Sequence, residues 1–173
     1  MGTMIKRRVF YSFHYVADSW RAATVRNIGV VEGNRPATDN KWEEVKKGGD
    51  TAIRKWIDGQ MKYRSCTLVL VGSRTAGRHW IDYEIRKSWE QGMGLAGIYI
   101  HGLLDQDSNE SWMGRNPFEH FTVHSKAGHP YSLSSVVKCY NPEGYGSKEC
   151  YRWIRENLAY VVEEAIQIRN AYP

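Results

Sequence analysis

Short apolar runs alternate with amphipathic stretches along this chain, and the alternation predicts its secondary structure. Residues 9–13, 67–71 and 95–100 are runs of β-branched, aromatic or other apolar side chains, which are typical of buried strands. Elsewhere apolar side chains recur every three or four positions, which is the period of a helix. The clearest stripe predicts a C-terminal helix over residues 147–170 and consists of Ile154, Leu158, Val161, Ala165 and Ile168.

Two earlier helices follow from the same period. The first runs over residues 20–27, with Asp18 or Ser19 as its N-cap, because these side chains accept hydrogen bonds from free backbone N–H groups. The second begins with Asp50 or Thr51 as its cap. Its expected inner side chains are Ile53, Trp56, Ile57 and Met61.

The remaining segments are less periodic. Residues 29–42 contain glycines and a proline, so we expect mostly loop around a short strand at residues 30–31. Residues 103–133 are polar and aromatic with weak periodicity, which predicts an irregular insertion. Residues 134–140 form the last predicted strand.

The resulting order is β-α-(β)-α-β-α-β-loop-β-α, which predicts a parallel sheet with helices on both faces. The expected fold class is α/β, a flavodoxin-like three-layer fold with a mostly parallel sheet of about five strands. No repeat, linker or low-complexity segment divides the chain. We therefore interpret residues 1–173 as one domain with an N-terminal tail at residues 1–7.

The composition is that of a soluble globular protein, with 42% hydrophobic and 25% charged residues among 173. No stretch approaches the roughly 20 apolar residues of a membrane span, and residues 1–8 lack the apolar core of a signal peptide. The three cysteines have no metal-like spacing, and Cys66 and Cys139 lie in apolar runs. We therefore expect reduced thiols in a cytoplasmic protein without a membrane partner.

The chain is basic, with a formal net charge of +5 and a pI of about 9.1. Tight basic clusters occur at residues 6–8 and 46–47, and acidic residues interrupt the rest. A nucleic-acid-binding face and a general attraction to anionic ligands explain this balance equally well. The charge alone does not decide between them.

Trp80 and Glu84 are the strongest candidates for a functional site. They lie four residues apart on a predicted helix that follows the strand at residues 67–71, so they share a face beside the carboxyl end of that strand. In open α/β sheets this edge is where ligands bind. An aromatic ring beside a carboxylate suits a nucleotide or sugar substrate. The helix has a predicted inner stripe of Ile81, Ile85, Ser88 and Trp89.

Each member of this pair also has an ordinary structural explanation. Glu84 would be a solvated helix glutamate paired with Lys87, which lies three residues further on. Trp80 would be a core tryptophan, as we expect for Trp56 and Trp89. On composition alone these explanations are favoured.

Two glycine-containing loops match nucleotide-binding motifs only in part. The loop at residues 72–79 has the glycine spacing of a phosphate-binding loop, but Arg78 and His79 replace the required Lys and Ser/Thr. Residues 144–146 precede a helix but lack the third glycine of a dinucleotide-binding loop, so we interpret them as a turn.

The histidines offer one further candidate. Glu119 with His120, His124 and His129 lies in the least periodic part of the chain and lacks the spacing of a metal site. We interpret these residues as solvated loop side chains and predict no metal. His14, at the end of the first strand, either faces the same crevice as Glu84 or hydrogen-bonds to a loop carbonyl, and both interpretations remain open.

Three segments together carry a family resemblance. Residues 9–15 read Val-Phe-Tyr-Ser-Phe-His-Tyr, residues 67–73 are a strand ending in Gly-Ser, and residues 78–85 read Arg-His-Trp-Ile-Asp-Tyr-Glu-Ile. They resemble a TIR domain and, more narrowly, the TIR-like family of the bacterial Thoeris anti-phage system, the ThsB proteins. The resemblance extends from residue 8 to about residue 158 and includes residues 25–27, 42–47 and 140–153.

The resemblance implies cleavage of NAD⁺ at the nicotinamide–ribose bond, with Glu84 as the catalytic residue and NAD⁺ as substrate rather than cofactor. A carboxylate there would stabilise the positive charge that develops on the ribose. The implied product is an ADP-ribose-derived, cyclic signalling nucleotide that activates a separate effector protein. The implied partners also include a phage-derived trigger and a second TIR domain through self-association.

The aromatic and polar side chains around this crevice are candidates for contacting the substrate. They are Ser12, Phe13, His14, Trp42, Trp80 and Tyr83. Two rival hypotheses remain. One is a TIR scaffold that signals by protein association without turnover. The less favoured one is a nucleotide- or nucleic-acid-binding protein that uses the basic surface, which would show a steep salt dependence.

Overall fold

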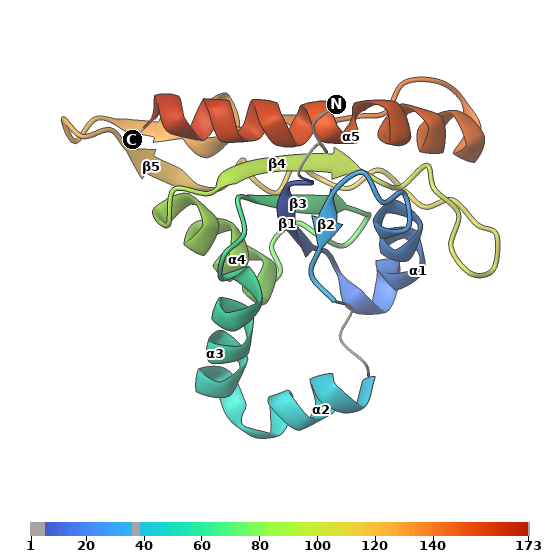
Figure 1. The fold of residues 1–173 in the computed structure, drawn as a ribbon, viewed down its shortest axis with the longest axis horizontal. Helices are drawn as coiled ribbons and strands as arrows, with labels where there is room; N and C mark the ends of the chain where they lie inside the picture. The colour runs from blue at the N-terminus through green and yellow to red at the C-terminus, as the bar shows by residue number, and fades with distance from the viewer. Residues whose placement is uncertain (1–5, 36–38, 173) are drawn as a thin grey trace.

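The computed structural model describes residues 6–35 and 39–172 and shows one parallel sheet between two layers of helices (Figure 1). The strand order is β2-β1-β3-β4-β7, and all four pairings are parallel. This order has the doubly wound pattern of flavodoxin-like folds, so the predicted fold class is confirmed. The strands are β1 Arg8–Ser12, β2 Glu32–Gly33, β3 Cys66–Val71, β4 Gly94–Tyr99 and β7 Cys139–Tyr140.

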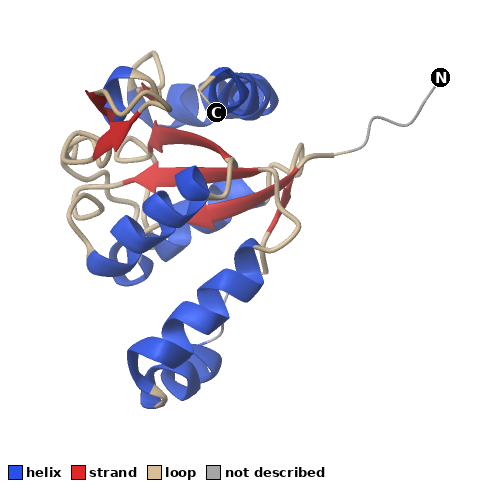
Figure 2. Ribbon diagram, turned by 90° about the vertical axis from the view of Figure 1, so that its left-hand side faces the viewer, coloured by secondary structure: helices blue, strands red, loops and turns tan. Residues whose placement is uncertain are grey.

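Helices cover both faces of this sheet. Helices α1 and α5 lie on one face, and α3 and α4 lie on the other. Helix α2 comes after β2 in the chain, and together with α3 it projects beyond the sheet (Figure 2). None of the helices in the described part of the chain is long and apolar enough to cross a membrane. The helices are α1 Tyr15–Arg26, α2 Asp39–Lys47, α3 Gly49–Met61, α4 His79–Glu90 and α5 Gly146–Ala171.

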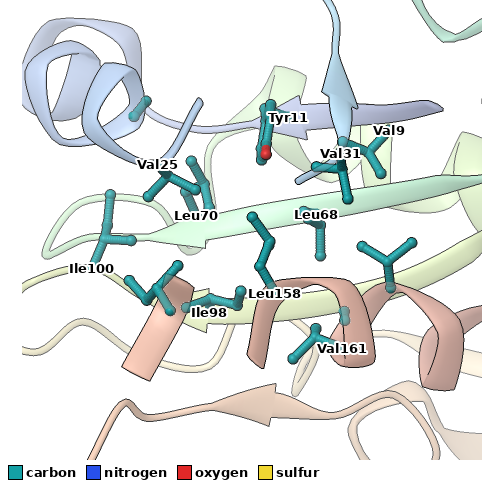
Figure 3. Close-up of a cluster of buried hydrophobic side chains, with 14 of the residues drawn as sticks. Val9, Tyr11, Val25, Val31, Leu68, Leu70, Ile98, Ile100, Leu158 and Val161 are labelled. Carbon is teal, nitrogen blue, oxygen red and sulfur yellow. The ribbon is translucent and has the colours of Figure 1, made fainter. Parts of the chain in front are cut away.

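The core forms on both sides of β3 and β4, whose twelve residues are all buried. On one side Leu68, Leu70 and Ile98 pack against the inner stripe of α5 (Figure 3). That stripe includes Leu158 and Val161, as its spacing predicts. The side chains of β1 alternate between the two faces, so Tyr11 points toward this cluster while Phe10 packs against α3.

On the opposite face, Val69 and Val71 of β3 pack against Ile81, Ile85 and Trp89 of α4. These three α4 residues belong to the predicted inner stripe, which is therefore confirmed. Its polar member, Ser88, is also fully buried.

The predicted helix caps are wrong. Helix α1 begins at Tyr15 because the ring of His14 caps it: His14 Nδ1 accepts a hydrogen bond from the Ala17 N–H at 3.0 Å. Asp18 therefore lies inside the helix, where it is buried. Helix α3 begins after Gly48 without any side-chain cap.

The segment expected to be mostly loop contains a helix. Helix α2 forms because Trp42 finds an apolar partner in Trp56 of α3, with ring centroids 5.8 Å apart. This contact is tertiary and leaves no periodic signal in so short a segment. The edge strand pairs at Glu32 and Gly33 rather than at residues 30–31. The predicted loop also includes residues 36–38, which lie outside the described part of the chain.

The last predicted strand is shorter than residues 134–140. Only Cys139 and Tyr140 pair with β4, and a 3₁₀ turn precedes them at Leu133–Ser135. Before this turn, the insertion at 103–133 carries an antiparallel hairpin of β5 Thr122–His124 and β6 Pro130–Ser132. Of the predicted tail, residues 1–5 lie outside the described residues.

A buried arginine fixes the start of this insertion on α1. Arg21 donates from Nε to the Leu103 carbonyl and from Nη2 to the Asn109 carbonyl, both at 2.8 Å. Its Nη1 donates to Asp18 Oδ1 at 2.9 Å. Because the ion pair is almost fully buried, these bonds are worth more than the same contacts at the surface. The insertion thus lies over the carboxyl edge of the sheet on a fixed path.

Two glycines permit the close approach at this edge. A Cβ at Gly72 would lie 2.0 Å from Asp18 Oδ2, and a Cβ at Gly114 would lie 2.1 Å from the Gly72 carbonyl oxygen. Real Cβ atoms do not approach other heavy atoms so closely. The insertion therefore contacts the end of β3 by backbone, without room for a side chain.

We predict opposite effects of Ala at two glycines. Gly114→Ala is expected to destabilise the protein by about 2–4 kcal/mol, because its methyl group would meet backbone rather than a flexible side chain. Gly59→Ala, in α3 with open space around it, is expected to stabilise by about 0.5–1 kcal/mol. Urea denaturation measures both, and equal stabilities of the two variants would contradict the close approach.

Candidate active site

Glu84 and Ser12 meet across the layer between the sheet and α4. Ser12 is the last residue of β1 and is buried, and Glu84 lies in the second turn of α4. The Ser12 hydroxyl donates a hydrogen bond to Glu84 Oε2. The alternation along β1 turns Ser12 to the same face as Phe10, which is the face that α4 covers. The contact between Ser12 and Glu84 therefore depends both on the alternation of side chains along β1 and on the rotation of α4 about its axis.

A second polar contact anchors α4 at the level of Glu84. The buried Ser88 hydroxyl is hydrogen-bonded to Thr67 Oγ1 of β3 at 2.6 Å and to the Glu84 carbonyl oxygen at 2.7 Å. These groups lie among apolar side chains, where an unsatisfied hydroxyl would be costly. The contact fixes the position of α4 against β3. Helical spacing alone does not indicate this role, although Ser88 is the one polar residue in the predicted inner stripe of α4.

Burial sets the protonation of the Glu84 carboxyl. Removal from water raises its pKa from 4.5 to about 8, and the hydrogen bond from Ser12 opposes the rise by stabilising the charged form. Among the described residues Glu84 forms no ion pair with a cation. Lys87 Nζ instead lies 3.4 Å from Asp58 Oδ2 of α3. The explanation of Glu84 as the solvated partner of Lys87 is therefore wrong. At neutral pH this half-buried carboxyl is therefore protonated in most molecules.

Aromatic side chains from three helices gather on the same face as Glu84. Trp80 is half-buried, and its ring lies 5.9 Å from that of Tyr83. The Tyr83 hydroxyl donates to Asp58 Oδ1 at 2.7 Å. Trp42 joins them through Trp56. All four rings pack against one buried cluster, which contains Phe10 of β1.

Two further predicted site residues turn toward α1 instead. Phe13 stacks on Tyr15, at 6.5 Å between ring centroids, and packs against the core beneath α1 and α5. His14 uses Nδ1 to cap α1, which requires that nitrogen to be unprotonated. Burial, together with the charges of Arg78 and Arg74, lowers the pKa of His14 and favours that neutral form. The bond runs from a backbone N–H to the ring, so His14 does not donate to a loop carbonyl through this nitrogen.

The structure thus sorts the predicted site residues into two groups. Ser12 contacts Glu84 directly, and Trp42, Trp80 and Tyr83 share its face of the sheet. Phe13 and His14 lie around the start of α1.

The loop histidines do not form a metal site in the described part of the chain. No group of three or more His, Cys, Asp or Glu side chains there is placed to hold an ion. His120 instead lies 3.1 Å from Asp82 of α4, measured from Nε2 to Oδ2. It lines a small cavity of about 160 Å³ with Ala76, Arg115, Asn116 and Glu119.

Two sequence comparisons identify the proteins that this chain resembles. The family model described as Thoeris protein ThsB, TIR-like domain, matches residues 10–105, which include both Ser12 and Glu84. The chain is also 41% identical over 120 residues to the putative cyclic ADP-D-ribose synthase ThsB1 of Bacillus cereus (strain MSX-D12). That alignment covers 66% of this chain and 62% of the length of the relative.

The raised pKa of Glu84 makes a prediction about stability. Because the folded-state pKa lies above 4.5, the unfolded chain releases this proton first as pH rises. The wild type should therefore lose stability relative to Glu84→Gln between about pH 4.5 and pH 8. The stability advantage of the variant should be on the order of 4 kcal/mol at pH 7.5 and vanish below pH 4.5, since one pKa unit corresponds to about 1.4 kcal/mol.

Chemical denaturation at pH 4.5 and pH 7.5 measures this difference. Glu90→Gln, which removes an exposed carboxylate from the same helix, is the matched control. A stability difference between wild type and Glu84→Gln that stays constant between the two pH values would contradict the buried carboxyl.

Proposed function

Because the chain belongs to the TIR-like domain family of the Thoeris protein ThsB, we propose that it is an enzyme that cleaves NAD⁺. It releases nicotinamide and converts the ADP-ribose part into a cyclic signalling nucleotide. The observation that carries this proposal is the half-buried Glu84 carboxyl, held by Ser12 beside an aromatic cluster. The name of the Bacillus cereus relative, a putative cyclic ADP-D-ribose synthase, supports the class of product.

The chemistry needs a carboxylate more than a nucleophile. When the bond between nicotinamide and ribose breaks, its electron pair leaves with nicotinamide, and positive charge develops on the ribose carbon and ring oxygen. Glu84 in its carboxylate form stabilises that charge, and the desolvated site makes the interaction stronger than it would be in water. The cationic nicotinamide ring of bound NAD⁺ favours this ionised form, which the free site holds in the minority near neutral pH.

Ring closure requires a nucleophile of the substrate itself to reach the ribose carbon before water does. The rings of Trp42, Trp80 and Tyr83 offer flat apolar surfaces on the same side as Glu84. Such surfaces exclude water and stack against the bases of a folded dinucleotide. We therefore assign these residues to substrate binding.

The proposed biological role follows from the family. The nucleotide product activates a separate effector protein in anti-phage defence, in response to a phage-derived trigger. No cofactor other than the substrate NAD⁺ takes part. The three free cysteines agree with the reducing environment of the cytoplasm, where we place the reaction.

The first test removes the charge of Glu84. Glu84→Gln should lower the rate of nicotinamide release by about 10²–10³-fold, because it loses stabilisation of the transition-state charge. Glu90→Gln should retain the wild-type rate. Nicotinamide and cyclic product are measured by mass spectrometry of reactions with NAD⁺ and of infected cells. Full release or full phage protection by Glu84→Gln would instead favour the scaffold that signals by association.

The second test uses pH. In the wild type, kcat/KM should rise with pH to a midpoint near 8, where the free Glu84 ionises. Ser12→Ala removes the hydrogen bond that stabilises the carboxylate, so it should move this midpoint to higher pH. At pH 7 the variant should be about tenfold slower, since a hydrogen bond to a charged group is worth about 1.5–3 kcal/mol. An unshifted pH midpoint in Ser12→Ala would show that Ser12 does not affect the ionisation of Glu84 during turnover.

A further inference from the structure

A larger cavity opens at the other end of the sheet, where β3 and β4 begin. Its volume is about 560 Å³, within the range of small-molecule sites. Buried Met61 and Met93 contribute apolar surface to its lining. Its other lining residues are Asp58, Lys62, Tyr63, Arg64 and Gln91. None of the predicted site residues belongs to this lining.

Tyr63 at this cavity has a backbone conformation that a tyrosine rarely adopts. Its φ is +63°, in the left-handed region that favours glycine, and it follows the end of α3 at Met61. Tyr63 is also 77% exposed, so packing does not explain a tyrosine here. Lys62 Nζ lies 5.1 Å from the centre of the Tyr63 ring. A strained, exposed aromatic side chain in a cavity points to a ligand.

Two cations at the cavity favour an anionic ligand. Arg64 donates from Nε to the Gln60 carbonyl at 2.6 Å and from Nη1 to the Val9 carbonyl at 3.1 Å. These bonds fix the guanidinium, whose Nη2 has no hydrogen-bond partner among the described residues. Lys62 is exposed beside it. A fixed guanidinium with free donors and a flexible ammonium are the groups that bind phosphate in proteins.

We propose that this cavity is a second ligand site, which binds a nucleotide with its phosphate on Lys62 and Arg64 and its base stacked on Tyr63. The cavity volume accommodates such a ligand, and an exposed tyrosine ring stacks on any base. This binding proposal does not depend on the proposed NAD⁺ cleavage.

The site is connected to the helix that carries Glu84. Asp58 lines the cavity and also accepts hydrogen bonds from Tyr83 and Lys87 of α4. A phosphate that attracts Lys87, or a base that displaces Asp58, changes contacts of Lys87 and Tyr83, which lie three residues and one residue from Glu84 in α4. Nucleotide binding therefore alters turnover at the proposed active site, and this second claim rests on the proposed function.

Isothermal titration of the full chain with ADP tests the site. The Glu84→Gln background is used so that no turnover contributes heat. In this background Tyr63→Gly should weaken ADP binding by about tenfold or more, and Lys62→Gln should do the same. Tyr63→Gly should keep or raise the thermal midpoint, because glycine relaxes the positive φ. Lys55→Gln, an exposed lysine of α3 that does not line the cavity, should bind ADP as the background protein does.

Each outcome decides the proposal. Unchanged ADP affinity in both Tyr63→Gly and Lys62→Gln, or no binding to the background protein at millimolar ADP, overturns it. Inorganic phosphate that binds as tightly as ADP overturns the role of the ring. Because binding is measured without turnover, failure of the NAD⁺ cleavage leaves this result intact. In the wild type, ADP should change the rate of nicotinamide release, and Tyr63→Gly should abolish that change while retaining the basal rate.

Discussion

Burial of β3 and β4 on both faces is the constraint on which the rest of the molecule depends. Every side chain of these strands is removed from water, so each face of the sheet needs an apolar cover. The inner stripe of α4 provides part of that cover and fixes the rotation of the helix. Glu84 is carried toward β1 by this rotation. The free energy of apolar packing, about 25 cal/mol per Å² of buried surface, thus offsets the cost of partly desolvating a carboxyl.

The elements that this constraint governs could be predicted from the sequence. A strand buried on both faces is a continuous apolar run, and a covering helix has a stripe, so β3, β4, α4 and α5 were recognisable. The caps and edges were not, because their determinants are distant or unusual. An imidazole ring caps α1, and Trp42 requires Trp56 on another helix to hold α2 in place. Strand β7 has only two residues, too few for a periodic signal.

The candidate active site likewise combines residues that local sequence patterns indicate with contacts between segments far apart in the chain. Helical spacing and the family resemblance identified Glu84 and Trp80. The pKa of Glu84 depends first on its burial in the folded layers and then on the hydrogen bond from Ser12, which lies 72 residues away in the chain. The Ser-Phe-His segment looked like one candidate surface. The alternation of a strand sends Ser12 to one face and Phe13 to the other, and the start of α1 then takes His14. Neighbours in sequence therefore serve different layers of the fold.

The Arg21 clamp has a consequence for how this edge of the molecule can change. Both insertion groups that accept its hydrogen bonds from Nε and Nη2 are backbone carbonyls, which every amino acid supplies. These two anchor points therefore do not depend on which side chains Leu103 and Asn109 carry, and Trp112 and Met113 further along are exposed. Substitutions of exposed side chains such as Trp112 and Met113 can therefore change the chemistry of this outer surface while the two anchor points beside the sheet stay in place. The exposed side chains of the insertion can therefore vary without loss of the hydrogen bonds that hold its start against α1.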